Sequence, residues 1–181
     1  SEMRIRAVRA TKAALGSDKA MAPLEFEMRV LETALDALEQ SARNMACGAD
    51  DDVELVGRLL AFLQHGLRGS LTARGCALLG PASVGRGESL LRILNSTLRQ
   101  LESSSAARRQ FFHAARGFIA VQRGQLGTLR EALPGIPAEE LRFDGGDPGR
   151  QEAELEEALE VALQLLGRRG LGLFPESSPD A

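Results

Sequence analysis

Aromatic residues are scarce in this chain, which has seven Phe and neither Trp nor Tyr among 181 residues. Proteins that bind single-stranded nucleic acid stack bases on exposed aromatic rings, and phosphate binding needs a surplus of Lys and Arg on one face. Here 22 basic residues stand against 25 acidic ones, for a formal net charge of −3. We therefore expect no nucleic acid among the partners.

Cysteine, histidine and long apolar runs are also scarce. Two cysteines, Cys47 and Cys76, are too few for a disulfide framework and indicate a reduced, intracellular pair. Structural zinc sites usually draw ligands about two to four residues apart, whereas these cysteines and the two histidines, His65 and His113, lie at least eleven residues from one another. No run approaches the roughly 18 apolar residues of a membrane span. We expect a cytoplasmic protein with no metal and no cofactor.

Motifs that carry catalysis are missing as well. The segment GPASVGRGES, residues 80–89, invites comparison with a phosphate-binding loop. That loop needs Lys and then Ser or Thr after its last glycine, but Arg86 and Gly87 occupy those places. We interpret it as part of a surface loop from Gly69 to Glu88, and we interpret the acidic run at 152–160 as a solvated helix face. The chain is predicted not to be an enzyme.

What the chain does contain is a series of amphipathic helical patterns. Apolar residues three and four apart predict one buried stripe on each helix, and no segment alternates as a strand would. The expected helices cover about 24–46, 50–66, 88–102, 106–133 and 151–166. Gly124 and Gly127 predict that the fourth is either kinked or divided in two. These elements predict a single all-α domain, a compact bundle of five to eight helices.

The predicted domain covers residues 24–166, with a C-terminal tail at 167–181. A stretch rich in Pro and Gly at 134–149 is the best candidate for a linker within it. The N-terminal segment 1–23 is basic, and it resembles a targeting peptide or a helix that lies on an anionic membrane. An internal segment without either role is the other interpretation.

Arginines recur at intervals of seven on the fourth predicted helix, beginning next to Arg108. This spacing puts them on one stripe of the helix, opposite or beside a stripe of Phe residues. These arginines are Arg109, Arg116, Arg123 and Arg130. One interpretation is a solvated face whose stems cover apolar surface. The other is a contact surface for an acidic partner, because guanidinium groups pair well with carboxylates at interfaces.

Two blocks of this chain resemble the RUN-domain family. Residues 54–69, ELVGRLLAFLQHGLRG, are similar to a block of that family that closes in His-Gly-Leu. Residues 107–133, ARRQFFHAARGFIAVQRGQLGTLREAL, resemble a later block with a Gly-Arg-Ala-Phe-Ile core, read here as Ala-Arg-Gly-Phe-Ile. The resemblance extends over about residues 24–166.

The resemblance implies an all-helical, non-enzymatic adaptor or effector in vesicle trafficking or autophagy. Its partners would be small GTPases of the Rab, Rap or Arf-like groups, or tethering and membrane-fusion proteins that bring it to endosomes or lysosomes as a peripheral protein. From the two blocks we expect the partner-binding residues to be His65, Arg68, Arg109, Arg116 and Arg123.

The alternative is a helical scaffold or self-associating bundle with no GTPase partner. Such a bundle would use the apolar stripe of residues 24–45, or the acidic last helix, to form a homodimer.

Overall fold

The computed structural model describes residues 22–48, 53–66, 82–101, 104–135 and 148–173. Within these ranges the protein is all-α, because five helices pack together and no strand is present. This confirms the predicted fold class. The elements are α2 (Ala22–Ala46), α3 (Val53–Gly66), α5 (Ala82–Leu98), α6 (Ser105–Ala132), a short 3-10 helix η1 (Leu133–Gly135) and α7 (Pro148–Leu173).

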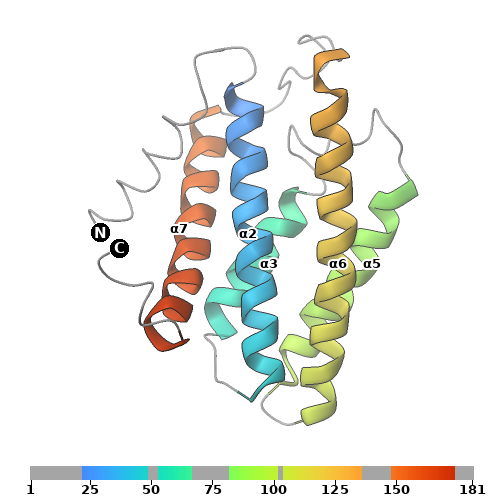
Figure 1. Ribbon diagram of the computed structural model, residues 1–181, viewed down its shortest axis with the longest axis vertical. Coiled ribbons are helices and arrows are strands. Elements are labelled where there is room, and N and C mark those ends of the chain that lie inside the picture. The colour runs from blue at the N-terminus through green and yellow to red at the C-terminus, as the bar shows by residue number, and fades with distance from the viewer. Residues whose placement is uncertain (1–21, 49–52, 67–81, 102–103, 136–147, 174–181) are drawn as a thin grey trace.

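The helices form two layers. In Figure 1, α7, α2 and α6 stand side by side in front, with α2 in the middle, and α3 and α5 lie behind them. The contacts agree, because α2 packs on α6, α7 and α3, while α5 packs on α6 and α3. The central helix is therefore surrounded on three sides, and α6 forms one side of the front layer.

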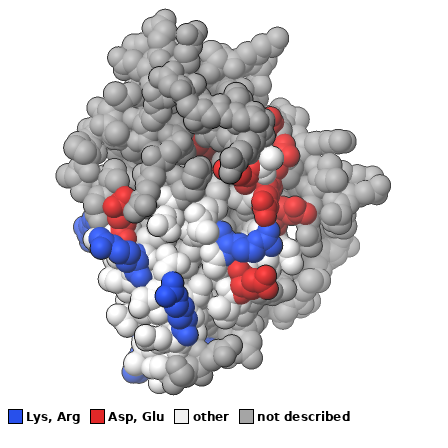
Figure 2. Space-filling view, turned by 180° about the vertical axis from the view of Figure 1, so that it is seen from behind, with Lys and Arg blue, Asp and Glu red and all other residues white. Residues whose placement is uncertain are grey.

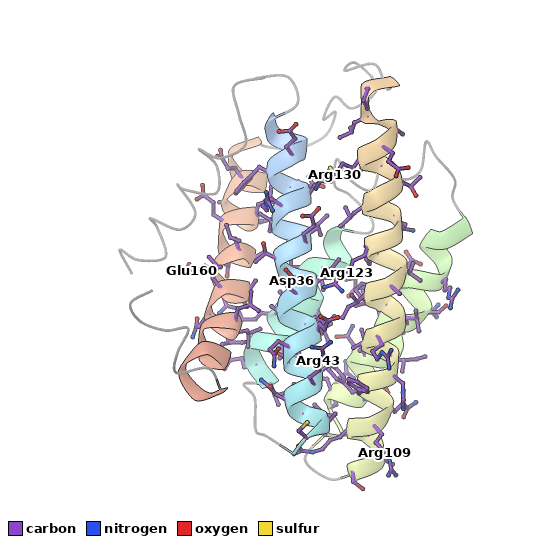
Figure 3. The ribbon with its side chains drawn as sticks, viewed as in Figure 1. Asp36, Arg43, Arg109, Arg123, Arg130 and Glu160 are labelled. Atoms are coloured by element: carbon purple, nitrogen blue, oxygen red, sulfur yellow. The ribbon has the colours of Figure 1, made fainter. Side chains whose placement is uncertain are left out.

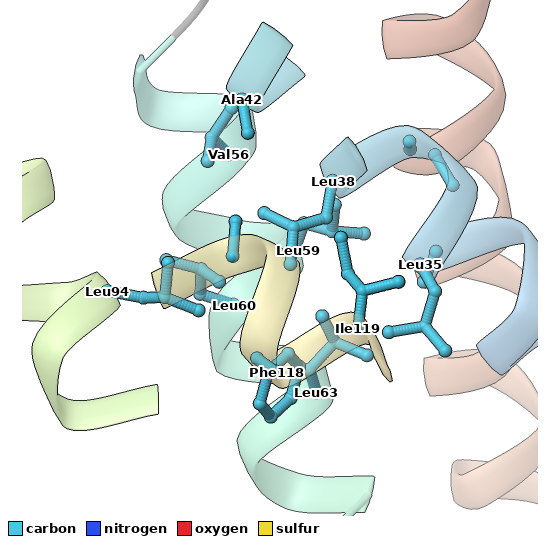
Figure 4. Packing of buried hydrophobic residues seen from close by; sticks show 14 of the residues in the cluster. Leu35, Leu38, Ala42, Val56, Leu59, Leu60, Leu63, Leu94, Phe118 and Ile119 are labelled. Carbon is cyan, nitrogen blue, oxygen red and sulfur yellow. The ribbon is translucent and has the colours of Figure 1, made fainter. Parts of the chain in front are cut away.

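The predicted apolar stripe of α2 is buried in the core. Its members are Met28, Leu31, Leu35, Leu38, Ala42 and Met45. Figure 4 shows Leu38 of α2 beside Leu59 of α3, with Phe118 of α6 close by. Each Leu, Met or Phe side chain of this kind contributes about 1.5–3 kcal/mol of transfer free energy when it leaves water. A satellite cluster of Phe26, Val30, Leu155, Ala158 and Leu159 joins α2 to α7.

The two ends of α2 follow from local chemistry. Glu25 in the first turn and Arg43 in the last complement the partial charges of the helix ends. The helix ends at Ala46, and Gly48 in the turn that follows has a φ of 86°, a left-handed value that glycine adopts without steric cost. The N–H groups of Cys47 and Gly48 donate to the carbonyls of Arg43 and Met45, both at 3.1 Å, so the last turn is closed.

The surface loop predicted for 69–88 is wrong over 82–88, because α5 begins at Ala82. The glycines at 85 and 87 suggested a loop, since each costs about 1 kcal/mol in a helix. They are outweighed by packing, as the leucines of α5 are buried against α6 and α3. The comparison of residues 80–89 with a phosphate-binding loop loses its basis, because residues 82–89 are helical.

Helix α6 is one continuous helix, so of the two alternatives predicted at Gly124 and Gly127, a kink or a division, the division into two helices is wrong. Helix α7 begins at Pro148 and continues to Leu173, so residues 167–173 belong to the helix and not to a tail. Once a helix has formed, each further residue that joins it adds one hydrogen bond, so extending the helix is easier than starting it. An isolated glycine therefore weakens a helix without ending it.

No helix among the described residues is long and apolar enough to cross a lipid bilayer.

Candidate functional site

Helix α6 carries the arginine stripe, and its start is set by a serine cap. Ser104 has an extended backbone, and its hydroxyl accepts a hydrogen bond from the N–H of Ala107 at 3.2 Å. The buried side of the helix includes Phe111, Phe118 and Leu129. Residues seven apart lie almost two turns apart, about 10.5 Å along the axis, so the four arginines share one exposed stripe.

The stripe divides into two halves. We call Arg123 and Arg130 the C-terminal arginines, and Arg109 and Arg116 the N-terminal arginines. All four are exposed, but only the C-terminal arginines form ion pairs with α2 among the residues that the structure describes.

The C-terminal arginines bind the acidic edge of α2, which we define as Glu32, Asp36 and Glu39. Arg123 Nη2 lies 2.7 Å from Asp36 Oδ1, and its Nη1 lies 3.1 Å from Glu39 Oε2. Arg130 donates to Glu32. Figure 3 shows Asp36 and Arg123 pointing toward one another between α2 and α6. The later arginine of α6 pairs with the earlier acid of α2, so the two helices run antiparallel.

The pKa of Arg123 is raised above its ordinary value. Partial burial of the guanidinium acts to lower this pKa, and the hydrogen bonds to Asp36 and Glu39 outweigh it. A raised pKa in the folded state means that the pairing stabilises the fold at neutral pH and is lost only as the pH rises through that value. The pair is half exposed, with 44% of the Arg123 side chain accessible, so water screens most of the attraction.

The register explains why the N-terminal arginines have no such partners among the residues that the structure describes. Seven residues back along α6 from Arg123 is Arg116, and seven residues forward on α2 from Asp36 is Arg43. Arg43 therefore occupies the position where an acid would be needed to pair with Arg116. The ion pair of Arg43 is a long contact of 3.9 Å with Glu39. For Arg109 the matching positions lie beyond Ala46, where α2 has ended. Figure 3 places Arg43 and Arg109 on this end of the seam.

Arg116 is held by an aromatic ring instead of an acid. Its guanidinium carbon lies 5.8 Å from the centroid of Phe112, a half-buried ring that packs against the core. His113 meets the same ring edge to face, with centroids 5.7 Å apart. A cation over a ring is stabilised without loss of net charge, so Arg116 still presents a positive charge to solvent.

Arg108, by contrast, has a structural role. Its side chain donates to the carbonyl oxygens of Leu101 and Met45, both at 3.3 Å. It thereby joins the start of α6 to the last turn of α2. Two carbonyls near chain turns are satisfied by this one guanidinium, which is only partly exposed.

The described part of the rear face carries no comparable row of arginines. Figure 2 shows it as mostly uncharged, with isolated arginines and with acidic side chains gathered on the side where α7 lies. Arg58 of α3 pairs with Glu157 of α7. Arg92 of α5 and Arg99, which directly follows the end of α5 at Leu98, are exposed and also seven residues apart, and they offer a control for the arginines of α6.

Of the five expected partner-binding residues, the structure brings three onto one stripe: Arg109, Arg116 and Arg123. His65 lies in the last turn of α3, but its side chain is outside the described residues, as is all of Arg68. Of the two cysteines, Cys47 is exposed and free and Cys76 lies outside the described residues. No group of three or more metal-ligating side chains gathers within the described ranges.

Sequence reasoning missed the acids that neutralise half of the stripe. The signal was present, because Glu32 and Glu39 on α2 have the same spacing of seven as Arg123 and Arg130 on α6. Matching repeats of opposite sign on two helices indicate that the helices pair through them. That signal becomes useful only when the two helices are known to be antiparallel neighbours.

Fold and site together define an all-α helical domain with a charged seam, half of which is satisfied within the domain. Comparisons with protein-family models, with curated proteins and with solved structures found no match for this chain.

Proposed function

We propose that this protein is a non-enzymatic interaction domain whose N-terminal arginines bind an acidic protein partner. The observation that carries the proposal is the contrast along α6: Arg123 and Arg130 have acids across the seam, whereas the register of the two helices puts Arg43 at the position opposite Arg116. Exposed guanidinium groups without carboxylate partners recognise carboxylates in a second molecule by two parallel hydrogen bonds.

Within that class, we propose an adaptor or effector in vesicle trafficking or autophagy. Its partner would be a small GTPase of the Rab, Rap or Arf-like type, or a tethering or fusion protein. The support is the resemblance of residues 54–69 and 107–133 to RUN-domain blocks. Those blocks supply much of α3 and α6, whose leucines and phenylalanines share one core. His65 and Arg68 stay predicted contact residues because they end the first block.

The mechanism is electrostatic attraction followed by close packing. Like charges on Arg109, Arg116 and Arg43 raise the local positive potential, which speeds the approach of an acidic partner. The contact of Arg116 with Phe112 restricts the guanidinium before binding. Less conformational entropy is then lost when the complex forms.

Self-association through the apolar stripe of α2 is less well supported, because that stripe is already buried within one chain. A dimer through that stripe would require the domain to open. Sedimentation of the free protein over a range of concentrations measures this directly, and we expect a monomer.

A binding assay with purified partners tests the proposal. Small GTPases of the three groups, loaded with GDP or a non-hydrolysable GTP analogue, and tethering proteins are titrated against wild type and an Arg109→Glu, Arg116→Glu variant. We expect at least one of them to bind, with about tenfold or greater loss of affinity in the variant. Preference for the GTP form identifies an effector, and equal binding of both forms identifies an adaptor.

The matched control is Arg92→Glu, Arg99→Glu, which makes the same charge change at the same sequence spacing, on α5 and in the turn that follows it. It should bind as wild type does. Equal weakening by both variants would show a general charge effect and would contradict the assignment of the site, as would full binding by the Arg109→Glu, Arg116→Glu variant. Absence of binding to every GTPase and tether would contradict the trafficking proposal.

A further inference from the structure

Helix α2 shows what kind of surface this stripe recognises. Its acidic edge places carboxylates at positions i, i+4 and i+7, which are Glu32, Asp36 and Glu39. Two of these positions meet Arg123, and the third meets Arg130. The domain thus contains one complete example of a helix bound through arginines seven residues apart.

The N-terminal arginines repeat that spacing, and α2 does not extend to serve them. Arg109 and Arg116 are separated by the same seven residues as Arg123 and Arg130. Opposite them α2 first presents Arg43 and then ends at Ala46. The helix that supplied acids to one half of the stripe therefore supplies none to the other.

We infer that the partner presents an acidic helix with the spacing of α2, with carboxylates at i, i+4 and i+7 on one face, and that it docks on Arg109 and Arg116. This inference rests on the proposed function and specifies the chemistry of its partner. Two carboxylates seven residues apart on a helix are about 10.5 Å apart, which is the separation of the two arginines along α6.

Arg43 widens the same positive surface. Its side chain is 60% exposed, and its pair with Glu39 is long, at 3.9 Å. By analogy with Asp36, the middle acid of the docking helix, at i+4, would pair with an arginine of α6, and Arg43 would add a third positive charge to the surface. The partner would then neutralise three arginines with three acids, which makes the association depend strongly on salt.

Two synthetic helical peptides of identical composition test the inference. The matched peptide has its three acids at i, i+4 and i+7, and the scrambled peptide has them spread around the helix. Binding to the full chain is measured by fluorescence anisotropy at low and high salt. We expect the matched peptide to bind about tenfold more tightly at low salt, and we expect Arg109→Glu, Arg116→Glu to abolish this difference.

Two further variants locate the binding. Arg92→Glu, Arg99→Glu should retain the preference for the matched peptide, and so should Arg123→Gln, Arg130→Gln. Loss of binding in the latter would mean that the peptide replaces α2 at its own seam, which would overturn the inference. Circular dichroism on each variant confirms that the helices remain formed.

The outcomes separate the inference from the function on which it rests. Equal binding of both peptides through Arg109 and Arg116 overturns the helical spacing and leaves an acidic protein partner. Binding of a purified GTPase or tether through these arginines, with neither peptide bound, does the same. No binding of peptides or proteins overturns both proposals. Stronger binding to vesicles of anionic lipid than to either peptide overturns the inference in favour of a membrane surface.

Discussion

The two halves of the α6 stripe have the same sequence pattern and different surroundings. Arg123 and Arg130 lie opposite the acidic edge of α2 and stabilise the packing of two helices. Arg109 and Arg116 lie opposite an arginine and then beyond the end of α2. A regular repeat of one residue type is therefore no guide to its role, because the charge on the neighbouring helix decides it.

The largest expected effect comes from removing the core that supports both halves. Phe118 lies between Arg116 and Arg123 in sequence and is fully buried. We expect Phe118→Ala to lower the free energy of unfolding by about 3–5 kcal/mol, because it leaves a cavity among α2, α3 and α6. Urea unfolding measures the loss. Phe112→Ala, at a half-buried ring, is the control, and an equal loss there would contradict the assignment of Phe118 to the centre of the core.

Charge reversal distinguishes the two halves by their effect on stability. Arg123→Glu, Arg130→Glu places new carboxylates against the acidic edge of α2. We expect this variant to lose about 1–2 kcal/mol of unfolding free energy, since favourable pairs become like charges. Arg109→Glu, Arg116→Glu should change the unfolding free energy by less than about 0.5 kcal/mol. Chemical denaturation at low salt compares the two variants, and equal losses would contradict the division of the stripe.

Glycine replacements compare the backbone of the two halves. A methyl group at Gly124 or Gly127 would meet nothing within 4 Å. Gly124→Ala should therefore raise the unfolding free energy by about 0.5–1 kcal/mol through helix propensity alone. Gly117 in the N-terminal half has Leu90 at 3.5 Å from the added methyl group, so its gain should be no larger. Thermal unfolding measures both, and a loss of stability in Gly124→Ala would contradict the open surroundings.

The smallest expected effect is the coupling across the seam. A double-mutant cycle on Arg123→Gln and Asp36→Asn should give a favourable coupling of about 0.5–1 kcal/mol, as half-exposed ion pairs do. The same cycle on Arg116→Gln and Arg43→Gln should give about zero or a few tenths of the opposite sign, because two positive charges repel weakly in water. A favourable coupling between Arg116 and Arg43 would show that the second half has a satisfied partner after all.

Local pattern was sufficient for the helices with the strongest apolar periodicity. The stripe of α2 lies where periodicity predicts it. The pattern was wrong where Gly85 and Gly87 suggested a loop in place of α5, and where Gly124 and Gly127 suggested, as one of two alternatives, a division of α6. In those places the cost of about 1 kcal/mol for each glycine is smaller than the gain from burying neighbouring leucines and phenylalanines.

The candidate site was found from the sequence only in part. The spacing of the arginines was visible, and three of the expected residues lie on one stripe. Arg123 was expected to face a partner protein, and its ion pairs with Asp36 and Glu39 place it within the domain's own seam. The sequence contains those acids, but nothing in a single helix indicates which other helix will lie against it.

What the sequence determined by itself is the set of amphipathic helices and the stripe of four arginines, because periodicity and spacing are properties of one helix. What only the tertiary structure decided is which arginines are neutralised. That outcome depends on the antiparallel direction of α2 and α6, on their register, and on the end of α2 at Ala46. Charges act through space over a few ångströms, so their partners are set by packing and not by position along the chain.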